Sequence, residues 1–335
     1  MRRFAAVAAG FFVALAFTGN APAQQIVAKY STPTINDVVH DGMKALKERI
    51  EKRIGDKIKI DIYPASQLGA IPRVVEGAQL GTIELVSVPA EFLVGLDSRF
   101  GVISAPGVFE NRMHGFQTLH DPEFKKAYWV LGQNKGIQFF SVQCNAEAIT
   151  IMRKPIHKLE DLSGLKIRTF PTALEREAYK RIGATVAPMP LDEVMPGLQQ
   201  GVIDGAKGGS SVYVGMKAYS VVKYLVRTKD TLVCPVHFAS KTWWDKLPND
   251  VREVIVEEAD KNDLENQKHS IEGDDGAMKT WVANGGEIDE LNADDQKKLH
   301  EMMETVGETA YANDPPALEM YRLMVKLAAK YRGKS

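Results

Sequence analysis

Hydrophobic and polar residues follow two different periods along the chain, and the periods alternate in a regular order. A strand pattern over 25–31 is followed by a helical pattern that begins near Asn36, with apolar residues three or four positions apart. Strict alternation over 57–63 then predicts a second strand. A helix over 73–80 and a strand over 82–88 complete the series. This order predicts a βαβαβ unit.

The same order recurs in the middle of the chain. Strands are predicted over 166–170, 184–189 and 202–206, and helices over about 172–183 and 192–200. Thr172 stands three residues before Glu175, which is the spacing of a capping box at a helix N-terminus. Right-handed crossovers make such strands parallel, so their carboxyl ends share the edge where open α/β sheets bind ligands.

A short internal repeat links the two units. Residues 77–84 and 197–204 share the pattern Gly-x-Gln-x-Gly-x-Ile-acid, and each stands between a predicted helix and the third strand of its unit. Two similar units predict two lobes that face each other across a cleft, which is the architecture of a hinged ligand trap.

The rest of the chain is predicted to connect these lobes. Strand patterns over 137–152 indicate a first crossing between lobes, and 231–240 a return strand. From Asn249 a helical pattern continues for a length of about 50 Å if it is unbroken, enough to brace both lobes. Two further helices are predicted over 293–306 and 316–331.

The first 23 residues have the features of a secretory signal peptide. Arg2 and Arg3 precede an apolar run over 4–17, and Ala21-Pro22-Ala23 supplies small residues for cleavage. We therefore expect the mature protein in the periplasm. The formal net charge of −1 argues against nucleic acid as a partner.

The chain contains two cysteines, Cys144 and Cys234. An oxidising compartment permits one bridge between them, but two cysteines do not make a disulfide framework. Two buried thiols are the favoured interpretation.

Arg168 is the main candidate for ligand binding. It lies near the carboxyl end of a predicted strand, beside the N-terminus of the following helix. A guanidinium next to a helix N-terminus favours an anion, most simply a carboxylate. The alternative is a salt bridge at the surface or between the lobes.

Further candidates lie at or just after predicted strand ends, and one lies on the predicted return strand. They are Phe170, Ser210, Ser211, Tyr213, His237 and Ser87. The hydroxyls and the imidazole can hydrogen-bond a ligand, and Phe170 can stack on an apolar ligand body. The alternatives are an ordinary glycine-rich turn for 208–213 and core packing for His237 and Phe170.

The usual catalytic motifs are absent from the sequence. There is no HExxH, GxSxG or CxxC motif, and Gly208-Gly209-Ser210-Ser211 lacks the ending of a P-loop. We therefore predict a binding protein rather than an enzyme, with no cofactor and no metal.

Several motifs, taken in order, resemble one family. They are Tyr63-Pro64-Ala65-Ser66-Gln67-Leu68-Gly69, Lys154-Pro155-Ile156, Leu162-Ser163-Gly164-Leu165-Lys166-Ile167-Arg168, Pro188-Met189-Pro190 and Leu198-Gln199-Gln200-Gly201-Val202-Ile203-Asp204-Gly205. With this set the chain is similar to the periplasmic solute-binding proteins of TRAP transporters, DctP type, over nearly its whole mature length.

The resemblance implies an α/β two-lobe periplasmic binding protein fold with crossing strands and a long bridging helix. We place 24–145 with about 232–265 in the first lobe, and about 146–231 with 266–335 in the second. The resemblance also implies capture of an organic acid, pairing of Arg168 with its carboxylate, and delivery to a sodium-driven permease with one small and one large subunit.

Two positions depart from the family pattern. A second ligand-facing arginine is expected about 20 residues before the first, but Ala148 stands there. An asparagine is expected after the Asp-Gly turn, but the turn continues Ala206-Lys207-Gly208. The missing arginine favours a monocarboxylate with an apolar or aromatic body. The alternative functions are presentation of the ligand to a sensor or another transporter class, and a secreted enzyme on the same fold.

Overall fold

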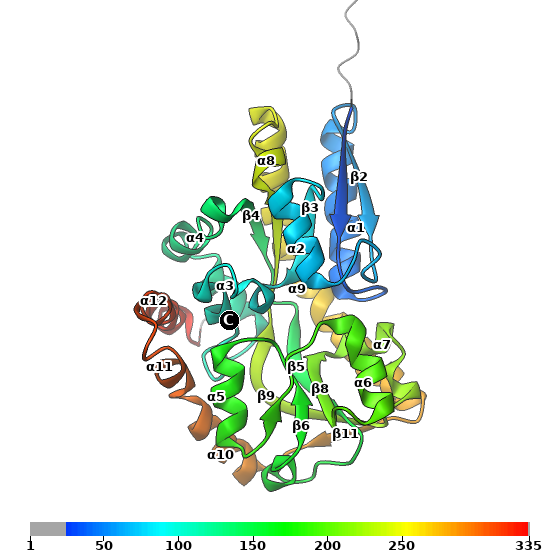
Figure 1. The fold of residues 1–335 in the computed structure, drawn as a ribbon, viewed down its shortest axis with the longest axis vertical. Helices are drawn as coiled ribbons and strands as arrows, with labels where there is room; N and C mark the ends of the chain where they lie inside the picture. Colours follow the sequence, from blue (N-terminus) through cyan, green and yellow to red (C-terminus); the bar gives the residue numbers. More distant parts are fainter. Residues whose placement is uncertain (1–24, 334–335) are drawn as a thin grey trace, which may run out of the picture.

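The computed structural model describes residues 25–333 as two β-sheets with helices packed around them (Figure 1). The predicted signal peptide over 1–23 lies outside the described residues. Within 25–333, no helix combines the length and the apolar character needed to cross a membrane.

The first sheet contains five strands in the order β2-β1-β3-β10-β4. Their bounds are β1 Ile26–Ser31, β2 Ile58–Tyr63, β3 Leu85–Pro89, β4 Ile137–Val142 and β10 Pro235–Ser240. Strand β1 is parallel to β2 and β3, whereas β10 is antiparallel to β3 and β4. Helices α1 (Val38–Ile54) and α2 (Ile71–Leu80) connect the parallel strands, so the first βαβαβ prediction is confirmed.

The second sheet contains six strands in the order β11-β9-β5-β8-β6-β7. Their bounds are β5 Ala146–Met152, β6 Lys166–Arg168, β7 Thr185–Val186, β8 Gly205–Gly209, β9 Tyr224–Val233 and β11 Glu287–Glu290. Strand β6 is parallel to β7 and β8, and the connecting helices are α5 (Ala173–Arg181) and α6 (Val194–Gln200). The second βαβαβ prediction is therefore also confirmed.

The two sheets repeat one arrangement, as the internal sequence repeat predicts. The order β2-β1-β3-β10-β4 corresponds to β7-β6-β8-β5-β9, including the antiparallel fourth strand. The repeated motif ends α2 at Gly81 and α6 at Gly201, which have φ of 78° and 73°. Glycine adopts this left-handed conformation without strain, so both helices stop at the equivalent point.

Several strand boundaries differ from prediction: β3 begins at Leu85 rather than at residue 82, β6 ends at Arg168 rather than at residue 170, and β7 is only Thr185–Val186. The third strand of the second unit begins at Gly205 rather than at residue 202, because 202–204 form the turn that follows α6. In that turn the Val202 amide donates to the Gly197 carbonyl, and the Asp204 carboxylate accepts from the Lys166 amide. Strand β9 begins at Tyr224, before the predicted return strand, and its first residues pair with β5 and β11.

The chain passes between the sheets at β4–β5 and again at β9–β10, and α9 (Asn249–Ala283, 35 residues) connects them a third time. The prediction of a long bridging helix is confirmed, and this helix is continuous over Asn249–Ala283. Helix α9 packs against α1 and β4, and farther along against α7 (Ser210–Gly215) and β11. It buries a polar stripe in its middle: Asn262, Asp263, Asn266, Gln267, Ser270 and Asp274.

Shorter helices cover the remaining surfaces. They are η1 Ala90–Leu93, η2 Ser98–Ser104, α3 Arg112–Leu119, α4 Pro122–Tyr128, α8 Lys241–Trp244, α10 Ala293–Met303, α11 Val306–Ala310 and α12 Pro315–Tyr331. Helix α12 packs against η2, α3 and α4, although we placed its residues in the second lobe. The proposed lobe boundaries stay a prediction.

The expectation of two buried thiols is wrong. Cys144 and Cys234 are buried, but their sulfur atoms form a disulfide bond. Sequence spacing could not show this, because 90 positions separate the two residues and only the paired crossing strands bring them together.

The hydroxyl of Thr172 should contribute measurably to stability. Its side chain accepts a hydrogen bond from the Glu175 amide at the N-terminus of α5, as the capping spacing predicts. We expect Thr172→Ala to lower the free energy of unfolding by about 1 kcal/mol, and Thr172→Ser, which keeps the cap, to lose less. Chemical denaturation of the three proteins checks this, and equal losses in both variants would contradict it.

Candidate functional site

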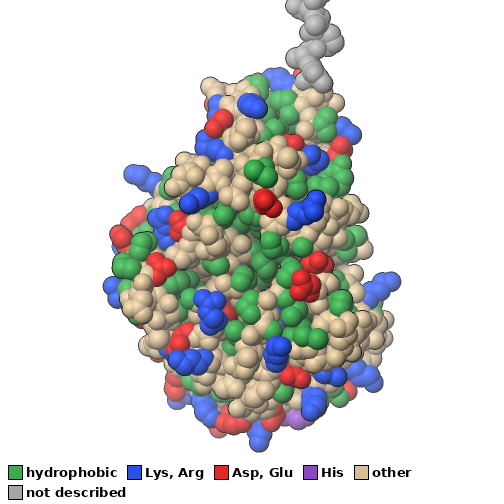
Figure 2. Space-filling view, in the orientation of Figure 1, with side chains coloured by type: hydrophobic (Ala, Val, Ile, Leu, Met, Phe, Trp, Pro, Cys, Tyr) green, Lys and Arg blue, Asp and Glu red, His purple; other side chains and the backbone are tan. Residues whose placement is uncertain are grey.

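Residues from both sheets meet where β3, β6 and β8 end. The rings of Phe92, after β3, and Phe170, after β6, lie edge to face with centroids 6.1 Å apart. Phe170 belongs to a buried apolar cluster with Ala146, Ala148 and Val233 of the crossing strands, and the partly buried Phe92 packs against this cluster. On the face drawn in Figure 2, charges of both signs are scattered and hydrophobic side chains gather around the junction of the upper and lower parts.

Arg168 is buried at this junction, with 2% of its surface exposed. Its Nε donates to the Met189 carbonyl (3.0 Å) and its Nη1 to the Lys207 carbonyl (2.7 Å). Its Cζ lies 5.0 Å from the centre of the Phe170 ring. No carboxylate among residues 25–333 forms a salt bridge with it. A buried cation held only by neutral groups has an unfilled preference for an anion.

The residue that holds Arg168 is itself fixed by an ion-pair cluster. The Lys207 ammonium lies 2.9 Å from the Glu175 carboxylate and 3.5 Å from Asp230, and all three groups are nearly buried. Burial lowers the pKa of Lys207, but Asp230 and Glu175 outweigh this effect and raise it overall. Because Arg168 pairs with Ala206 in the sheet, the Lys207 side chain points to the opposite face. Lys207 therefore presents its carbonyl, not its charge, to Arg168.

Tyr213 also holds the Lys207 carbonyl in place. Its hydroxyl donates to the Lys207 carbonyl (2.8 Å), and burial raises its pKa to about 12 although Arg168 opposes the shift. A Cβ atom at Gly208 would lie 2.8 Å from the Tyr213 hydroxyl, so glycine allows the close approach. Tyr213 is fully buried in the core beside β8 and helps to position Arg168.

The two serines that begin α7 differ in their partners. Ser210 donates to the Asp274 carboxylate of α9 at 2.6 Å. The buried Ser211 hydroxyl has no hydrogen-bond partner in the described part of the chain. Of the two predicted contacts, Ser211 therefore keeps an open hydrogen-bonding group, whereas Ser210 ties α7 to α9.

His237 and Ser87 stand directly opposite each other on β10 and β3. The Nδ1 atom of His237 shares a hydrogen bond with the Tyr30 hydroxyl. Its Nε2 and the Ser87 hydroxyl are buried without a partner among the described residues. Burial lowers the pKa of His237 to about 4, so the imidazole is neutral near pH 7. Whether these groups contact ligand stays a prediction.

Sequence reasoning missed Glu91, which follows β3 in η1. It is fully buried, and burial raises its pKa to about 7, with a further increase from Glu175 that Lys207 partly offsets. Its position shortly after a strand end was the available signal. It places another titratable group beside the Lys207 cluster.

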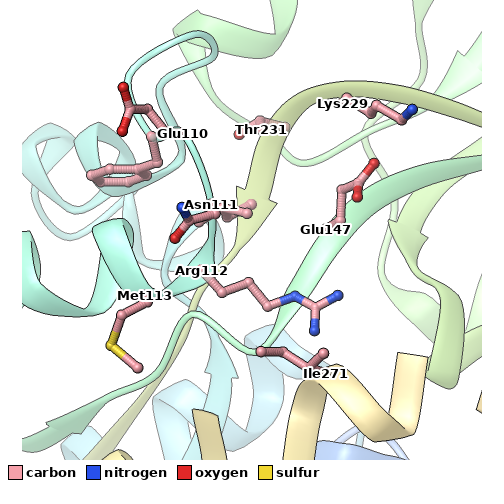
Figure 3. A pocket seen from close by; sticks show the side chains of 10 residues that line it. Glu110, Asn111, Arg112, Met113, Glu147, Lys229, Thr231 and Ile271 are labelled. Carbon is pink, nitrogen blue, oxygen red and sulfur yellow. The ribbon is translucent and has the colours of Figure 1, made fainter. Parts of the chain in front are cut away.

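A cavity of about 410 Å³, drawn in Figure 3, has a lining that does not include Arg168. It is lined by Phe109, Glu110, Asn111, Arg112, Met113, Glu147, Lys229, Thr231, Leu232 and Ile271. Its central charges are paired: Arg112 with Asp274, Glu147 with Arg227, and Lys229 with Glu290. The sequence held no signal for this cavity, because its walls come from α3, β5, β9 and α9.

Three groups near α9 have a spacing that could hold a metal ion: His120, Asp260 and Asp263. Their side chains already have protein partners. Asp263 accepts from Ser141 (2.7 Å) and Gln143 (2.9 Å), and Asp260 pairs with Lys125 (2.8 Å). The expected absence of a metal stays a prediction.

Comparison with known families and proteins adds an independent line of information. The model of the bacterial extracellular solute-binding protein, family 7, matches residues 30–314. The 2,3-diketo-L-gulonate-binding periplasmic protein YiaO of Escherichia coli is 26% identical over 243 residues, which cover 72% of this chain and 74% of that protein. The C4-dicarboxylate-binding periplasmic protein DctP of Vibrio cholerae is 24% identical over 286 residues, covering 84% and 85%.

The fold is also shared with solved structures. A TRAP periplasmic solute-binding protein from Desulfovibrio salexigens, crystallised with bound orotic acid, superposes with a TM-score of 0.85 at 23% identity. The match covers 91% of this chain and 99% of that protein. At this identity the likeness establishes the two-lobe fold.

The neutral state of buried His237 predicts a loss of stability in acid. The unfolded residue takes up a proton near pH 6.5, but the folded one only near pH 4, so the unfolded state binds more protons between these values. Lowering the pH from 6.5 to 4 should therefore cost about 3 kcal/mol through this residue. Chemical denaturation of wild type and His237→Asn at several pH values gives the free energy of unfolding of each protein as a function of pH. The difference between these two curves is the contribution of His237.

The exposed His269 supplies the matched control for this experiment. His269→Asn measures the effect of removing an exposed imidazole, and the change in His237→Asn is compared with it. If the free energy of unfolding changed with pH in the same way for wild type and His237→Asn, the lowered pKa of His237 would be contradicted.

Proposed function

The chain belongs to the bacterial extracellular solute-binding protein family 7 and is a solute-binding protein; from this premise we propose that its ligand is an organic acid. We further propose that the predicted signal peptide directs it to the periplasm, and that it delivers the acid to a TRAP-type permease of one small and one large subunit.

The single observation that carries the proposed ligand class is the state of Arg168. Its guanidinium is buried between the ends of the two sheets, and its identified partners are the carbonyls of Met189 and Lys207. A ligand carboxylate would supply the missing negative charge, and charge-assisted hydrogen bonds are stronger than those to neutral carbonyls. The binding residues remain our proposal.

The surroundings of Arg168 favour one carboxylate rather than two. Ala148, at the position of the expected second arginine, is buried against Phe170 and offers no charge. Ser87, Ser211 and His237 are neutral groups with unfilled hydrogen bonds, and the carboxyl groups of Glu91 and Glu175 also have oxygens without a partner among the described residues. We therefore propose a monocarboxylate that carries hydroxyl or carbonyl groups. This modifies the expectation of an apolar or aromatic body, because neutral polar groups, as well as Phe170, are available.

The mechanism is capture without turnover. A ligand bound at Arg168 on the second sheet can reach the first sheet only when the lobes are closed. Ligand contacts made from both sides stabilise the closed state over the open one, so binding shifts the population towards closure. The closed shape is then what a permease would recognise.

A ligand panel tests the proposed class. We expect D-galacturonate, L-gulonate or 2,3-diketo-L-gulonate to raise the melting temperature of the mature protein, and succinate and the neutral sugar D-galactose to leave it unchanged. Calorimetry then gives the affinity of each acid that binds. A melting temperature raised by succinate and not by the monocarboxylates would reject the single-carboxylate proposal.

Arg168→Lys should lose most of the affinity for any acid that binds the wild type. Lysine keeps the charge but cannot form the planar pair of hydrogen bonds, so we expect a loss of roughly 30-fold to 100-fold, or about 2–3 kcal/mol. Calorimetry measures the loss. Arg153→Lys, at an exposed position, is the matched control and should bind like wild type. Unchanged affinity in Arg168→Lys would remove Arg168 from the site.

A further inference from the structure

The disulfide joins the two places where neighbouring strands pass from one sheet to the other. Cys144 lies between β4, which ends at Val142 in the first sheet, and β5, which begins at Ala146 in the second. Cys234 is the single residue between β9 and β10. Both cysteines are at most 1% exposed. The bridge therefore lies inside the hinge rather than within either lobe.

Backbone pairing continues on both sides of the bridge. In the first sheet Val142 is opposite Val236, and in the second Ala146 is opposite Val233. Between these pairs the Gln143 amide donates to the Pro235 carbonyl at 3.0 Å. The crossing strands thus run as one two-stranded ribbon through the change of sheet.

The third connection between the sheets is attached at the same level. The Gln143 side chain donates to Asp263 of α9 (2.9 Å) and accepts from Asn266 (2.7 Å). Ser141 adds a hydrogen bond to Asp263 at 2.7 Å. All of these residues are buried. The crossing strands and α9 therefore form one connected hinge.

Domain opening changes backbone torsions in a few hinge residues. Two crossing strands held only by hydrogen bonds can twist and slide separately, which allows many different open arrangements. A covalent bond between residues 144 and 234 removes those separate movements.

We propose that the Cys144–Cys234 bridge makes the crossing strands move as one hinge and so limits the open, ligand-free protein to a narrow set of lobe arrangements. This conformational role does not depend on which ligand the protein binds. The tests below use ligand-free protein, so their outcome is separate from that of the ligand panel.

Interlobe distances test the proposal directly. Spin labels at Glu76→Cys on α2 and Lys180→Cys on α5 occupy exposed positions beside the first and second sheets. We expect the distance distribution of ligand-free protein to broaden at least twofold when Cys144→Ala and Cys234→Ala are added. An unchanged distribution would overturn the proposal.

Hydrogen exchange distinguishes the effect of the covalent bond from the effect of the packing of the two cysteine side chains. Either single variant breaks the bridge, so Cys144→Ala, Cys234→Ala and the double variant should all accelerate exchange in 137–152 and 224–240 to the same extent. Effects of the single variants that add up in the double variant would indicate lost packing and overturn the proposal, as would unchanged exchange.

Wild-type protein refolded in excess dithiothreitol completes the comparison, because it keeps both side chains and lacks only the bond. Dithiothreitol supplies two electrons and two protons and becomes a cyclic disulfide, and the protein gains two hydrogen atoms, which its mass confirms. The reduced protein should match the variants; exchange equal to that of the oxidised protein would overturn the proposal. This measurement also decides the question if the alanine variants do not fold.

Discussion

A guanidinium that is buried without a counter-charge is the constraint around which the centre of this protein is arranged. Arg168 ends β6, and its guanidinium donates hydrogen bonds to two backbone carbonyls, those of Met189 and Lys207. The second carbonyl is fixed from two sides, by the Tyr213 hydroxyl and by the Lys207 side chain in its cluster with Glu175 and Asp230. Isolated buried charge is unfavourable, so this support is consistent with a site that a ligand anion completes.

The duplicated βαβαβ unit explains why one arginine can serve a two-sided site. Each unit directs the carboxyl ends of its parallel strands to one edge, and the crossing strands bring the two edges together. Phe92 from the first edge reaches Phe170 from the second, next to the guanidinium. In the site that we propose, the first edge would contribute the neutral groups of Ser87 and His237, and the second edge would contribute the charge of Arg168. In that arrangement, a bound ligand would contact groups from both lobes.

Much of this arrangement could be predicted from periodicity and local signals. The apolar stripe of α1, the helix ends at Gly81 and Gly201 and the cap at Thr172 depend on residues only a few positions apart in the sequence. The place of Arg168 at the end of a strand was also predicted. The features that could not be predicted depend on distant pairing. The disulfide needs strands 90 residues apart, the Lys207–Asp230 contact needs β8 and the end of β9, and the first part of β9 lacks a clear alternation.

The last helix has a consequence for how the chain folds. Helix α12 buries Ala317, Met320, Tyr321, Met324, Leu327 and Ala328, and it packs against η2, α3 and α4 beside the first sheet. That sheet also needs β10, which comes after the whole second βαβαβ unit. The amino-terminal part of the chain therefore lacks a strand and a covering helix until Pro235–Ser240 and Pro315–Tyr331 have been synthesised. During translation, the helices η2, α3 and α4 therefore wait for their contacts with α12. A circular permutation that placed α12 at the start of the chain would let these contacts form earlier.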